Sequence, residues 1–393
     1  MAHIHYCNTK SPEWQTFYET FNAAYYENAR KANKGDETMY IDCQYRVLYN
    51  SDSQKLDKSY IVACHNALNE AFSGKNTGEI AKIPDNTLYP WKSRLGNPNI
   101  QFLPLNADEL KIQYIHISEG SLNDDEPVAH ASELGGISEG MMNIYIGNQE
   151  AGILGQAYLG GNEVFVLYSS VGGPNKPGQL SEYGLGKTLI HEVGHALSLP
   201  HTFSDDQCDG NKVFPDVPEQ IAPNFDTQLV QENGEWTQKG DNRYDDRKYS
   251  TNYSCLHIDD STNEMGINYM DYGVDNVSIM FTESQVLMMR AWLESPGARS
   301  YLTLRSSGYE SQATETPGSS SSSDSGLEDV FGSKNIGIAV IVVASVVGAL
   351  LIGYLIYRWK FKKSDHASQK LSTRYGLDLL KTPRLSNSYD IEW

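Results

Sequence analysis

The chain is organised around the stretch HEVGHALSLPH, residues 191–201. On a helix, His191 and His195 lie one turn apart on the same face, so both imidazoles can reach one metal ion. Glu192 projects beside them, where its carboxylate can take a proton from a metal-bound water. His201 lies beyond the helix end and can supply a third nitrogen if the chain turns back after His195. Three neutral imidazoles and one water form an open tetrahedral zinc site, the arrangement that catalysis requires.

Composition limits the class of protein. The 393 residues have room for two average domains or for one large domain with appendages. They include 50 acidic and 31 basic residues, a formal net charge of −19, which argues against nucleic acid as a partner. The 25 tyrosines and a modest apolar fraction are typical of a folded globular ectodomain rather than of a disordered chain.

An apolar run near the C-terminus predicts a membrane anchor. Residues 336–357 contain 22 residues without a charge, long enough to span a lipid bilayer as a helix. Basic residues follow at once, so the positive-inside rule places the C-terminus in the cytoplasm and the N-terminal part outside the cell or in a lumen. A buried core helix is the disfavoured alternative. The first 30 residues show no apolar signal-peptide region, which leaves three interpretations: the start of the gene is missing, the single span acts as a reverse signal-anchor, or the domain stays inside.

The remaining organisation follows from composition. We expect an N-terminal extension over residues 1–39, a candidate pro-segment with aromatic residues at helical spacing. Residues 40–304 hold the catalytic domain. A flexible Ser-rich stalk over residues 305–335 leads to the span at residues 336–357, and residues 358–393 form a cytoplasmic tail. The oligomeric state does not follow from the sequence.

Five cysteines are present and none forms a CxxC pair, which argues against a thiolate zinc site. Cys208 and Cys255 bracket the segment after the histidine motif and are the preferred disulfide pair, whereas Cys43 with Cys64 is a weaker pairing. Cys7 precedes the aromatic helix of the extension. We consider two interpretations for it: an unpaired thiol, or a latency switch whose thiolate occupies the open position on the metal.

Strand and helix patterns alternate in the catalytic domain, which predicts an α/β fold. Strand patterns cover residues 45–49, 99–104, 111–117, 142–146 and 164–169, and residues 152–160 suit a glycine-rich edge strand. A helix is expected over residues 60–72, with Ile61, Ala63, Leu68 and Phe72 towards the core. A second helix, residues 182–197, carries the histidine motif.

A second motif, NYMDY at residues 268–272, follows at a distance that allows a tight turn beneath the metal. Together the two motifs resemble the signature of the metzincin zinc metallopeptidases, HExxHxxxxxH followed by a Met-turn. Within that clan the chain is similar to the pappalysin (cytophagalysin-type) family over residues 40–295, through HEVGHALSLPHTF, CDGNKVFPDVPE, FTESQ and NIYIGNQEAGILGQAYLGG. The resemblance implies a twisted, mostly parallel sheet, an active-site helix and an irregular C-terminal subdomain that contains the Met-turn.

The resemblance also implies roles at the centre of the site. His191, His195 and His201 would bind zinc, and Glu192 would act as general base and acid. Met270 would form the hydrophobic floor under the imidazoles. Tyr272 would lie near the metal and help stabilise the tetrahedral oxyanion. The nearest rival is a thermolysin-like site with a downstream glutamate such as Glu219 in place of His201, and the Met-turn disfavours it.

Two further implications concern the periphery of the site. A polypeptide substrate would pair in extended form with the rim strand within residues 152–160, at Gly155, Gln156, Ala157 and Tyr158. Some family members also bind structural calcium after the third histidine. Carboxylates suited to that ion are Asp205, Asp206, Asp209 and Asp216, although acidic loop residues are more often only solvated.

Ser198 is the one departure from the metzincin pattern, which has glycine at this position. The residue must let the chain leave the helix, commonly in a left-handed conformation that costs a non-glycine residue about 1–2 kcal/mol. The other histidines, among them His65 and His116, are expected to be structural or surface residues.

Taken together, the motifs and the apolar run predict a membrane-anchored zinc endopeptidase. The alternative is an inactive binding or adhesion protein that keeps the fold.

Overall fold

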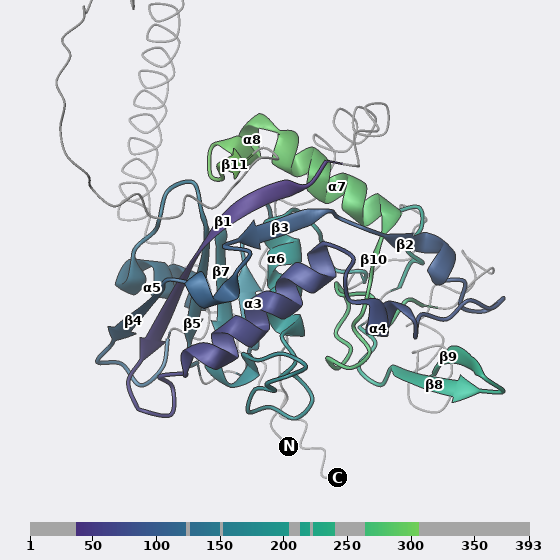
Figure 1. Ribbon diagram of the computed structural model, residues 1–393, viewed down its shortest axis with the longest axis horizontal. Coiled ribbons are helices and arrows are strands. Elements are labelled where there is room, and N and C mark those ends of the chain that lie inside the picture. The colour runs from purple at the N-terminus through teal and green to yellow at the C-terminus, as the bar shows by residue number, and fades with distance from the viewer. Residues whose placement is uncertain are drawn as a thin grey trace, which may run out of the picture. The chain divides into compact units, whose positions relative to one another are not determined.

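The computed structural model describes residues 37–122, 126–149, 152–203, 213–220, 223–239 and 264–305 (Figure 1). The predicted stalk after Arg305, the membrane span and the cytoplasmic tail lie outside these residues, as do Cys7, Cys208 and Cys255 and nearly all of the N-terminal extension. Within the described part of the chain, no helix is both long and apolar enough to cross a membrane.

The sheet is built around one long strand, β1 (Met39–Tyr49). In the described residues the sheet has seven strands in the order β11-β1-β5-β7-β6, and β3 and β4 also pair with β1. The pairings of β1 with β3, β4 and β5 and of β5 with β7 are parallel, whereas β11 and β6 are antiparallel. These strands are β3 (Ile100–Leu103), β4 (Ile112–His116), β5 (Met142–Gly147), β6 (Gly155–Ala157), β7 (Glu163–Leu167) and β11 (Leu304–Arg305). The predicted mixed α/β fold with a mostly parallel sheet is confirmed.

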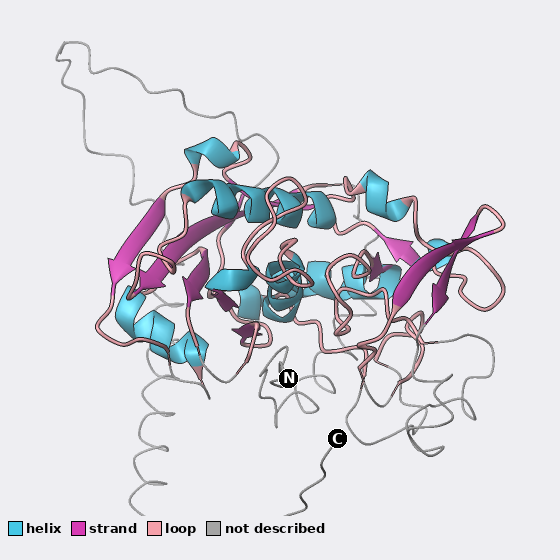
Figure 2. Cartoon of the chain, turned by 90° about the horizontal axis from the view of Figure 1, so that it is seen from below, coloured by secondary structure: helices cyan, strands magenta, loops and turns pink. Residues whose placement is uncertain are grey.

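Helices cover both faces of this sheet (Figure 2). Side chains alternate along a strand, so Ile144 and Ile146 of β5 lie in the main core and Tyr145 between them lies in a second cluster. The main core receives α3 (Lys58–Phe72) and α6 (Lys187–Ala196), and the second cluster receives α5 (Pro127–Gly135). The central strand β5 is therefore buried on both faces, as expected of a strand inside a parallel sheet.

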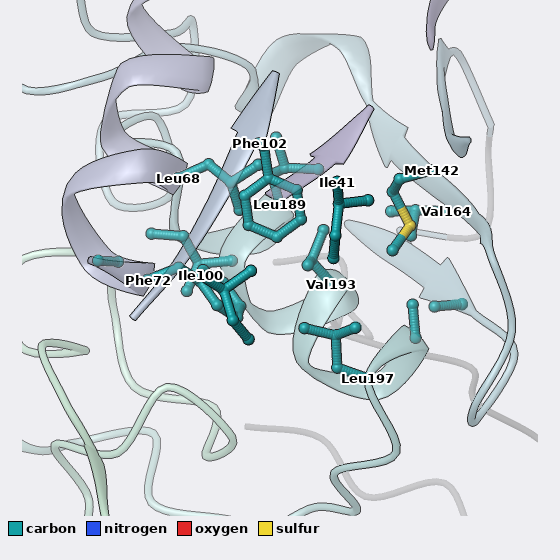
Figure 3. Packing of buried hydrophobic residues seen from close by; sticks show 14 of the residues in the cluster. Ile41, Leu68, Phe72, Ile100, Phe102, Met142, Val164, Leu189, Val193 and Leu197 are labelled. Atoms are coloured by element: carbon teal, nitrogen blue, oxygen red, sulfur yellow. The ribbon is translucent and has the colours of Figure 1, made fainter. Parts of the chain in front are cut away.

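The packing of α6 fixes where the histidine motif sits. Leu189 and Val193 of this helix and Leu197 at its end are buried in the main core (Figure 3). They pack in the cluster that also holds Met142 and Val164 of the sheet. Burying a side chain of this size contributes about 1.5–3 kcal/mol. The apolar face of α6 is thus anchored, and its opposite face carries the histidines.

Between the histidine motif and residue 281, the described residues contain little regular structure. A hairpin of β8 (Gln228–Glu232) and β9 (Glu235–Lys239) projects from this region (Figure 1). Helix α7 (Glu283–Glu294) then begins with a capping box between Thr282 and Gln285. The remaining elements are α4 (Thr77–Ile80), α8 (Pro296–Arg299), and the short antiparallel pair β2 (Leu95–Gly96) and β10 (Phe281–Thr282).

Two sequence-based expectations are wrong in detail. The motif helix begins at Lys187 and not at residue 182, because Gly186 adopts a left-handed conformation, φ 88°, that a helix cannot include.

The second concerns the cysteines. Cys43 and Cys64 are free thiols and form no disulfide. Both pack in or against the core, where burial raises the pKa of each thiol and disfavours the thiolate that disulfide formation requires.

Candidate metal centre

Three imidazoles converge beside α6. Nε2 of His195 lies 3.0 Å from Nε2 of His191 and 3.1 Å from Nε2 of His201. His191 and His195 come from successive turns of the helix, and His201 from the segment that turns back after it. In the described residues this trio is the group of metal-binding side chains that lies close enough to share one ion, and Glu219 is not part of it.

Hydrogen bonds orient two of these rings. Nδ1 of His191 donates to the carbonyl oxygen of Tyr269 at 2.7 Å, and Nδ1 of His195 donates to that of Leu199 at 2.6 Å. With the proton held on Nδ1, the lone pair of Nε2 points to the centre of the trio. Burial lowers the pKa of His191 to about 4 and that of His195 and His201 well below the ordinary value. All three rings are therefore neutral at pH 7, the form that binds metal.

The arrangement fits zinc. Ligand nitrogens 2.0–2.1 Å from a tetrahedral ion lie roughly 3.3 Å apart. The observed separations of 3.0 and 3.1 Å are close to that value. Three neutral imidazoles with no thiolate or carboxylate among them match the donor set of a catalytic zinc site. The residues present are thus suited to hold the ion and to leave a fourth position open.

A Schellman motif ends α6 and sends the chain to His201. The N–H of Leu199 donates to the carbonyl of Gly194 at 2.9 Å, and the N–H of Ser198 donates to that of His195 at 2.8 Å. Ser198 has φ 73°, so the left-handed conformation expected at this position is confirmed. A methyl group on Gly160 would lie 2.9 Å from Oγ of Ser198. The missing side chain at Gly160 therefore leaves room for the serine.

The N-terminal end of α6 is closed by a residue far away in sequence. Its N-cap residue, Gly186, has no side chain to cap the helix. Oδ2 of Asp275 instead accepts the N–H groups of Leu185 at 2.6 Å and Lys187 at 3.4 Å. Asp275 is buried, and this desolvation raises the pKa of its carboxyl to about 7. An acidic group thus caps the helix at a position where the helix dipole favours negative charge.

The predicted Met-turn passes directly beneath the helix. Oδ1 of Asn268 accepts the N–H of Met270 at 2.9 Å, and the N–H of Asp271 donates to the carbonyl of Asn268 at 3.1 Å. A methyl group on Gly194 would lie 2.5 Å from the sulfur of Met270. The glycine inside the histidine motif is therefore what allows Met270 to approach the helix.

Around the Met-turn, Asp271 and Tyr272 complete the site. The buried carboxylate of Asp271 accepts hydrogen bonds from Gln220 at 2.8 Å and from the backbone N–H of Asn224 at 2.9 Å and of Tyr272 at 2.7 Å. The Tyr272 ring lies 5.0 Å from that of His201 and 5.7 Å from that of His191, measured between centroids. Tyr272 is thus next to two of the three imidazoles.

Among the described residues Nδ1 of His201 has no hydrogen-bond partner, and an aromatic ring orients the imidazole instead. Phe203 stacks on it with ring centroids 4.6 Å apart and planes inclined by 8°. Phe203 in turn contacts Tyr272 edge-on at 4.9 Å. The third imidazole is therefore held by ring packing, where the first two are held by hydrogen bonds.

Glu192 packs against the rim strand β6. Glu192 is fully buried, and a methyl group on Gly155 would lie 2.5 Å from its Cγ and Oε1. Of the other predicted substrate-binding residues, Ala157 and Gln156 are buried, and Oε1 of Gln156 accepts the N–H of Val128 at 3.1 Å. Tyr158 is 43% exposed. Strand β6 is the last strand in its sheet, as predicted for an edge strand.

A pocket opens next to the trio. Its lining includes His191, Glu192, Tyr272, Tyr183, Asp275 and Ser278. The buried carboxyl of Asp275 is therefore both the cap of α6 and part of a cavity beside the metal-binding atoms. The arrangement offers a space next to the metal position in which part of a bound molecule can lie.

The remaining predicted ligands and histidines have structural surroundings. Asp216 accepts hydrogen bonds from Thr282 Oγ1 at 2.8 Å and from the N–H of Ser284 at 2.9 Å, so its carboxylate supports the start of α7. Asp205, Asp206 and Asp209 lie outside the described residues, and calcium binding stays a prediction. His65 is buried and bonds to the Tyr45 hydroxyl at 3.0 Å and to the carbonyl of Pro104 at 3.0 Å, so it is structural as expected.

Sequence reasoning missed Gly194 and Asp275 as parts of this site, and it named Gly155 only as a substrate-binding residue, without its contact to Glu192. For Gly194 a signal existed, since a glycine inside a helix usually marks a close approach of another group. Gly155 and Asp275 act through contacts across the fold, to Glu192 and to the start of α6. No local pattern in the sequence marks such contacts.

Comparison with known proteins agrees with this geometry. Residues 181–294 match the family model described as Peptidase_M43: Pregnancy-associated plasma protein-A. An extracellular metalloprotease of Colletotrichum graminicola is 33% identical over 130 residues, which are 33% of this chain and 37% of that protein. Extracellular metalloprotease 1 of Coccidioides posadasii is 30% identical over 159 residues, 37% of this chain and 46% of that protein. The chain therefore matches less than half the length of these relatives.

Solved structures share the fold. Mirolysin in complex with compound 9 superposes with a TM-score of 0.53 at 24% identity, covering 67% of this chain and 96% of that one. A promirolysin mutant of Tannerella forsythia gives a TM-score of 0.54 at 23% identity, covering 75% and 96%. The three histidines of the site lie within the range, residues 181–294, that is similar to this metallopeptidase family.

Proposed function

We propose that this chain is a zinc-dependent endopeptidase that hydrolyses peptide bonds of extracellular or lumenal proteins. The observation that carries the proposal is the convergence of three neutral Nε2 atoms 3.0 and 3.1 Å apart, beside a pocket that His191 and Glu192 both line. The likeness of residues 181–294 to a metallopeptidase family supports the same chemistry.

A zinc ion held by His191, His195 and His201 would polarise the scissile carbonyl and make a water more acidic. Glu192 accepts the proton of the attacking water and later donates it to the leaving amine, so one carboxyl serves as base and then as acid. The Tyr272 ring lies close enough to the histidines for its hydroxyl to stabilise the oxyanion. The free edge of β6 holds an extended substrate by main-chain pairing, as in other strand-addition complexes.

We further propose that residues 336–357 anchor the protein in a membrane with its catalytic domain on the outer side. The apolar run and the basic residues after it support this orientation. Two relatives are named extracellular metalloproteases, which agrees with a catalytic domain outside the cytoplasm. The N-terminal extension, with Cys7 as a latency switch, and a disulfide between Cys208 and Cys255 belong to the same proposal.

The direct test compares the wild-type chain with Glu192→Ala. Bound zinc is measured by metal analysis, and cleavage of casein is followed before and after limited proteolysis that removes the N-terminal extension. We expect about one zinc per chain in both proteins. The variant should lose cleavage by at least about a hundredfold, since a general base contributes that much or more.

If the chain binds zinc but shows no cleavage of casein that Glu192→Ala abolishes, the proposed peptidase activity is contradicted. That result would support the alternative, an inactive binding protein with this fold.

Replacing Cys7 by alanine tests latency separately. If this substitution leaves the activity of the full-length protein unchanged, the latency switch is excluded.

Removal of zinc with a chelator should abolish cleavage and lower the melting temperature, since an ion that binds the folded state stabilises it.

A further inference from the structure

A largely buried ion pair lies at the start of the active-site helix. Nζ of Lys187, the first residue of α6, lies 2.6 Å from Oε1 and 2.8 Å from Oε2 of Glu79. The two side chains are 6% and 22% exposed. Glu79 belongs to α4, so the pair joins two elements that are more than a hundred residues apart in sequence.

This pair is not explained by the helix itself. A positive side chain at a helix N-terminus opposes the helix dipole, and burial of its ammonium adds a desolvation cost. Buried ion pairs are often no more stabilising than apolar residues of similar size. A role in positioning other groups is therefore the more informative explanation.

The pair lies against Tyr269, the residue before the Met-turn methionine. The Lys187 ammonium lies 5.3 Å from the centroid of the Tyr269 ring. Nδ2 of Asn76 donates to the Tyr269 hydroxyl at 3.0 Å and to Oε2 of Glu79 at 3.1 Å. On its other side the ring packs on Phe281 at 4.7 Å. Tyr269 is buried and contacted at its ring face and at its hydroxyl.

Tyr269 contacts one of the predicted metal ligands: its carbonyl oxygen accepts a hydrogen bond from Nδ1 of His191 at 2.7 Å. Lys187 and His191 are also four residues apart on one helix, so they lie on the same face. The ion pair therefore reaches His191 by two routes, through Tyr269 and through the first turn of α6. Groups that orient a ligating imidazole affect metal affinity without touching the metal.

We propose that Glu79 and Lys187 are positioning residues that hold Tyr269 and, through its carbonyl, the imidazole of His191 in the orientation that binds zinc. This inference rests on the proposed zinc site. It assigns these two residues no contact with substrate and no proton transfer.

The test measures zinc release from the full chain into a chromogenic chelator. In Glu79→Gln we expect zinc to dissociate about tenfold faster than from wild type, the lower end of the range for lost outer partners of ligands. The absorption bands of the cobalt-substituted protein should change as well, because they report the geometry around the ion. Glu232→Gln is the matched control, since it removes the Glu232–Lys239 pair, whose side chains are more than half exposed, and should change neither readout.

Two further variants keep the proposal testable if Glu79→Gln folds poorly. The double variant Glu79→Gln with Lys187→Met leaves no unpaired buried charge, and it should fold yet still release zinc faster than wild type. Tyr269→Phe removes the hydroxyl, and its effect should not add to that of Glu79→Gln, because both act in one network.

Wild-type rates of zinc release and a wild-type cobalt spectrum in the folded double variant would overturn the proposal, even if its stability had changed. Failure of the enzyme proposal looks different: the wild-type chain would bind zinc without cleaving peptides, while zinc release would still report on Glu79 and Lys187.

Discussion

The two ends of α6 are built in opposite ways. Each carries a residue in the left-handed conformation, Gly186 with φ 88° before the helix and Ser198 with φ 73° after it. At the C-terminal end, the hydrogen bonds that close the helix join residues 193–199 to one another, and the N–H of Gly160 adds one to the carbonyl of His195 at 3.0 Å. At the N-terminal end, the closing groups are Asp275 and, through Lys187, Glu79. The first end is closed mainly by neighbours in the sequence and the second by side chains from distant parts of the fold.

The surroundings of the two left-handed residues also differ. A methyl group on Gly186 would lie 2.8 Å from the carbonyl oxygen of Gly172, which is backbone and cannot move aside. At Ser198 the neighbouring chain carries Gly160, whose missing side chain makes room. A side chain is thus tolerated at the C-terminal end and excluded at the N-terminal end.

The largest effect should come from Gly186→Ala. It combines left-handed strain with a backbone clash, so we expect a loss of about 2–4 kcal/mol in the free energy of unfolding. Urea unfolding measures it. Gly234→Ala is the control, because Gly234 also has a positive φ, 89°, and no atom lies within 4 Å of an added methyl group. That control should lose only about 1–2 kcal/mol. Equal losses in both variants would mean that the N-terminal end is no more constrained than an open turn.

Gly155→Ala disturbs the centre of α6 and leaves both ends intact. The added methyl group must displace the Glu192 side chain, so we expect peptide cleavage to fall by about a hundredfold with zinc still bound. Cleavage rates and metal content provide the measurement. Gly120→Ala, which adds a methyl group where no atom lies within 4 Å, should retain wild-type cleavage. Full activity of Gly155→Ala would show that Glu192 does not need its present position.

Asp275→Asn tests the distant cap through pH. Because burial raises the pKa of Asp275 to about 7, the native state binds a proton that the unfolded state releases between about pH 4 and pH 7. This group therefore lowers the stability of the wild type as pH rises through that window, by on the order of 2 kcal/mol between pH 5 and pH 8. The asparagine variant should lose this part of the slope in urea unfolding. Parallel pH profiles of the two proteins would contradict the raised pKa.

The smallest effect is expected for Ser198→Gly. Glycine relieves the left-handed strain and removes a buried hydroxyl that has no hydrogen-bond partner within the described residues. After the greater freedom of glycine in the unfolded chain is subtracted, we expect a gain of about 1 kcal/mol. Ser198→Ala, which removes the hydroxyl and keeps the strain, should gain less. A destabilised glycine variant would mean that the serine contributes contacts beyond those described.

Much of the architecture could be predicted from local patterns. The strand periods in residues 142–146 and 164–169 and the helix over residues 60–72 appear as β5, β7 and α3 within a few residues. Boundaries were less predictable, since the start of α6 depends on Gly186, whose neighbours come from Ala67 and Gly172. The free thiols of Cys43 and Cys64 could not be inferred from spacing either, because pairing depends on geometry in three dimensions.

By itself, the sequence determined which side chains can meet near α6 and how that helix ends. Helical spacing places His191 and His195 on one face, and Ser198 with Pro200 turns the chain towards His201, because these are interactions between near neighbours. Only the tertiary structure decided what surrounds them: the carbonyl of Tyr269 on His191, Gly155 against Glu192, and Asp275 at the start of the helix. These contacts join residues many tens of positions apart, and they exist only once the sheet, α6 and the Met-turn have packed together.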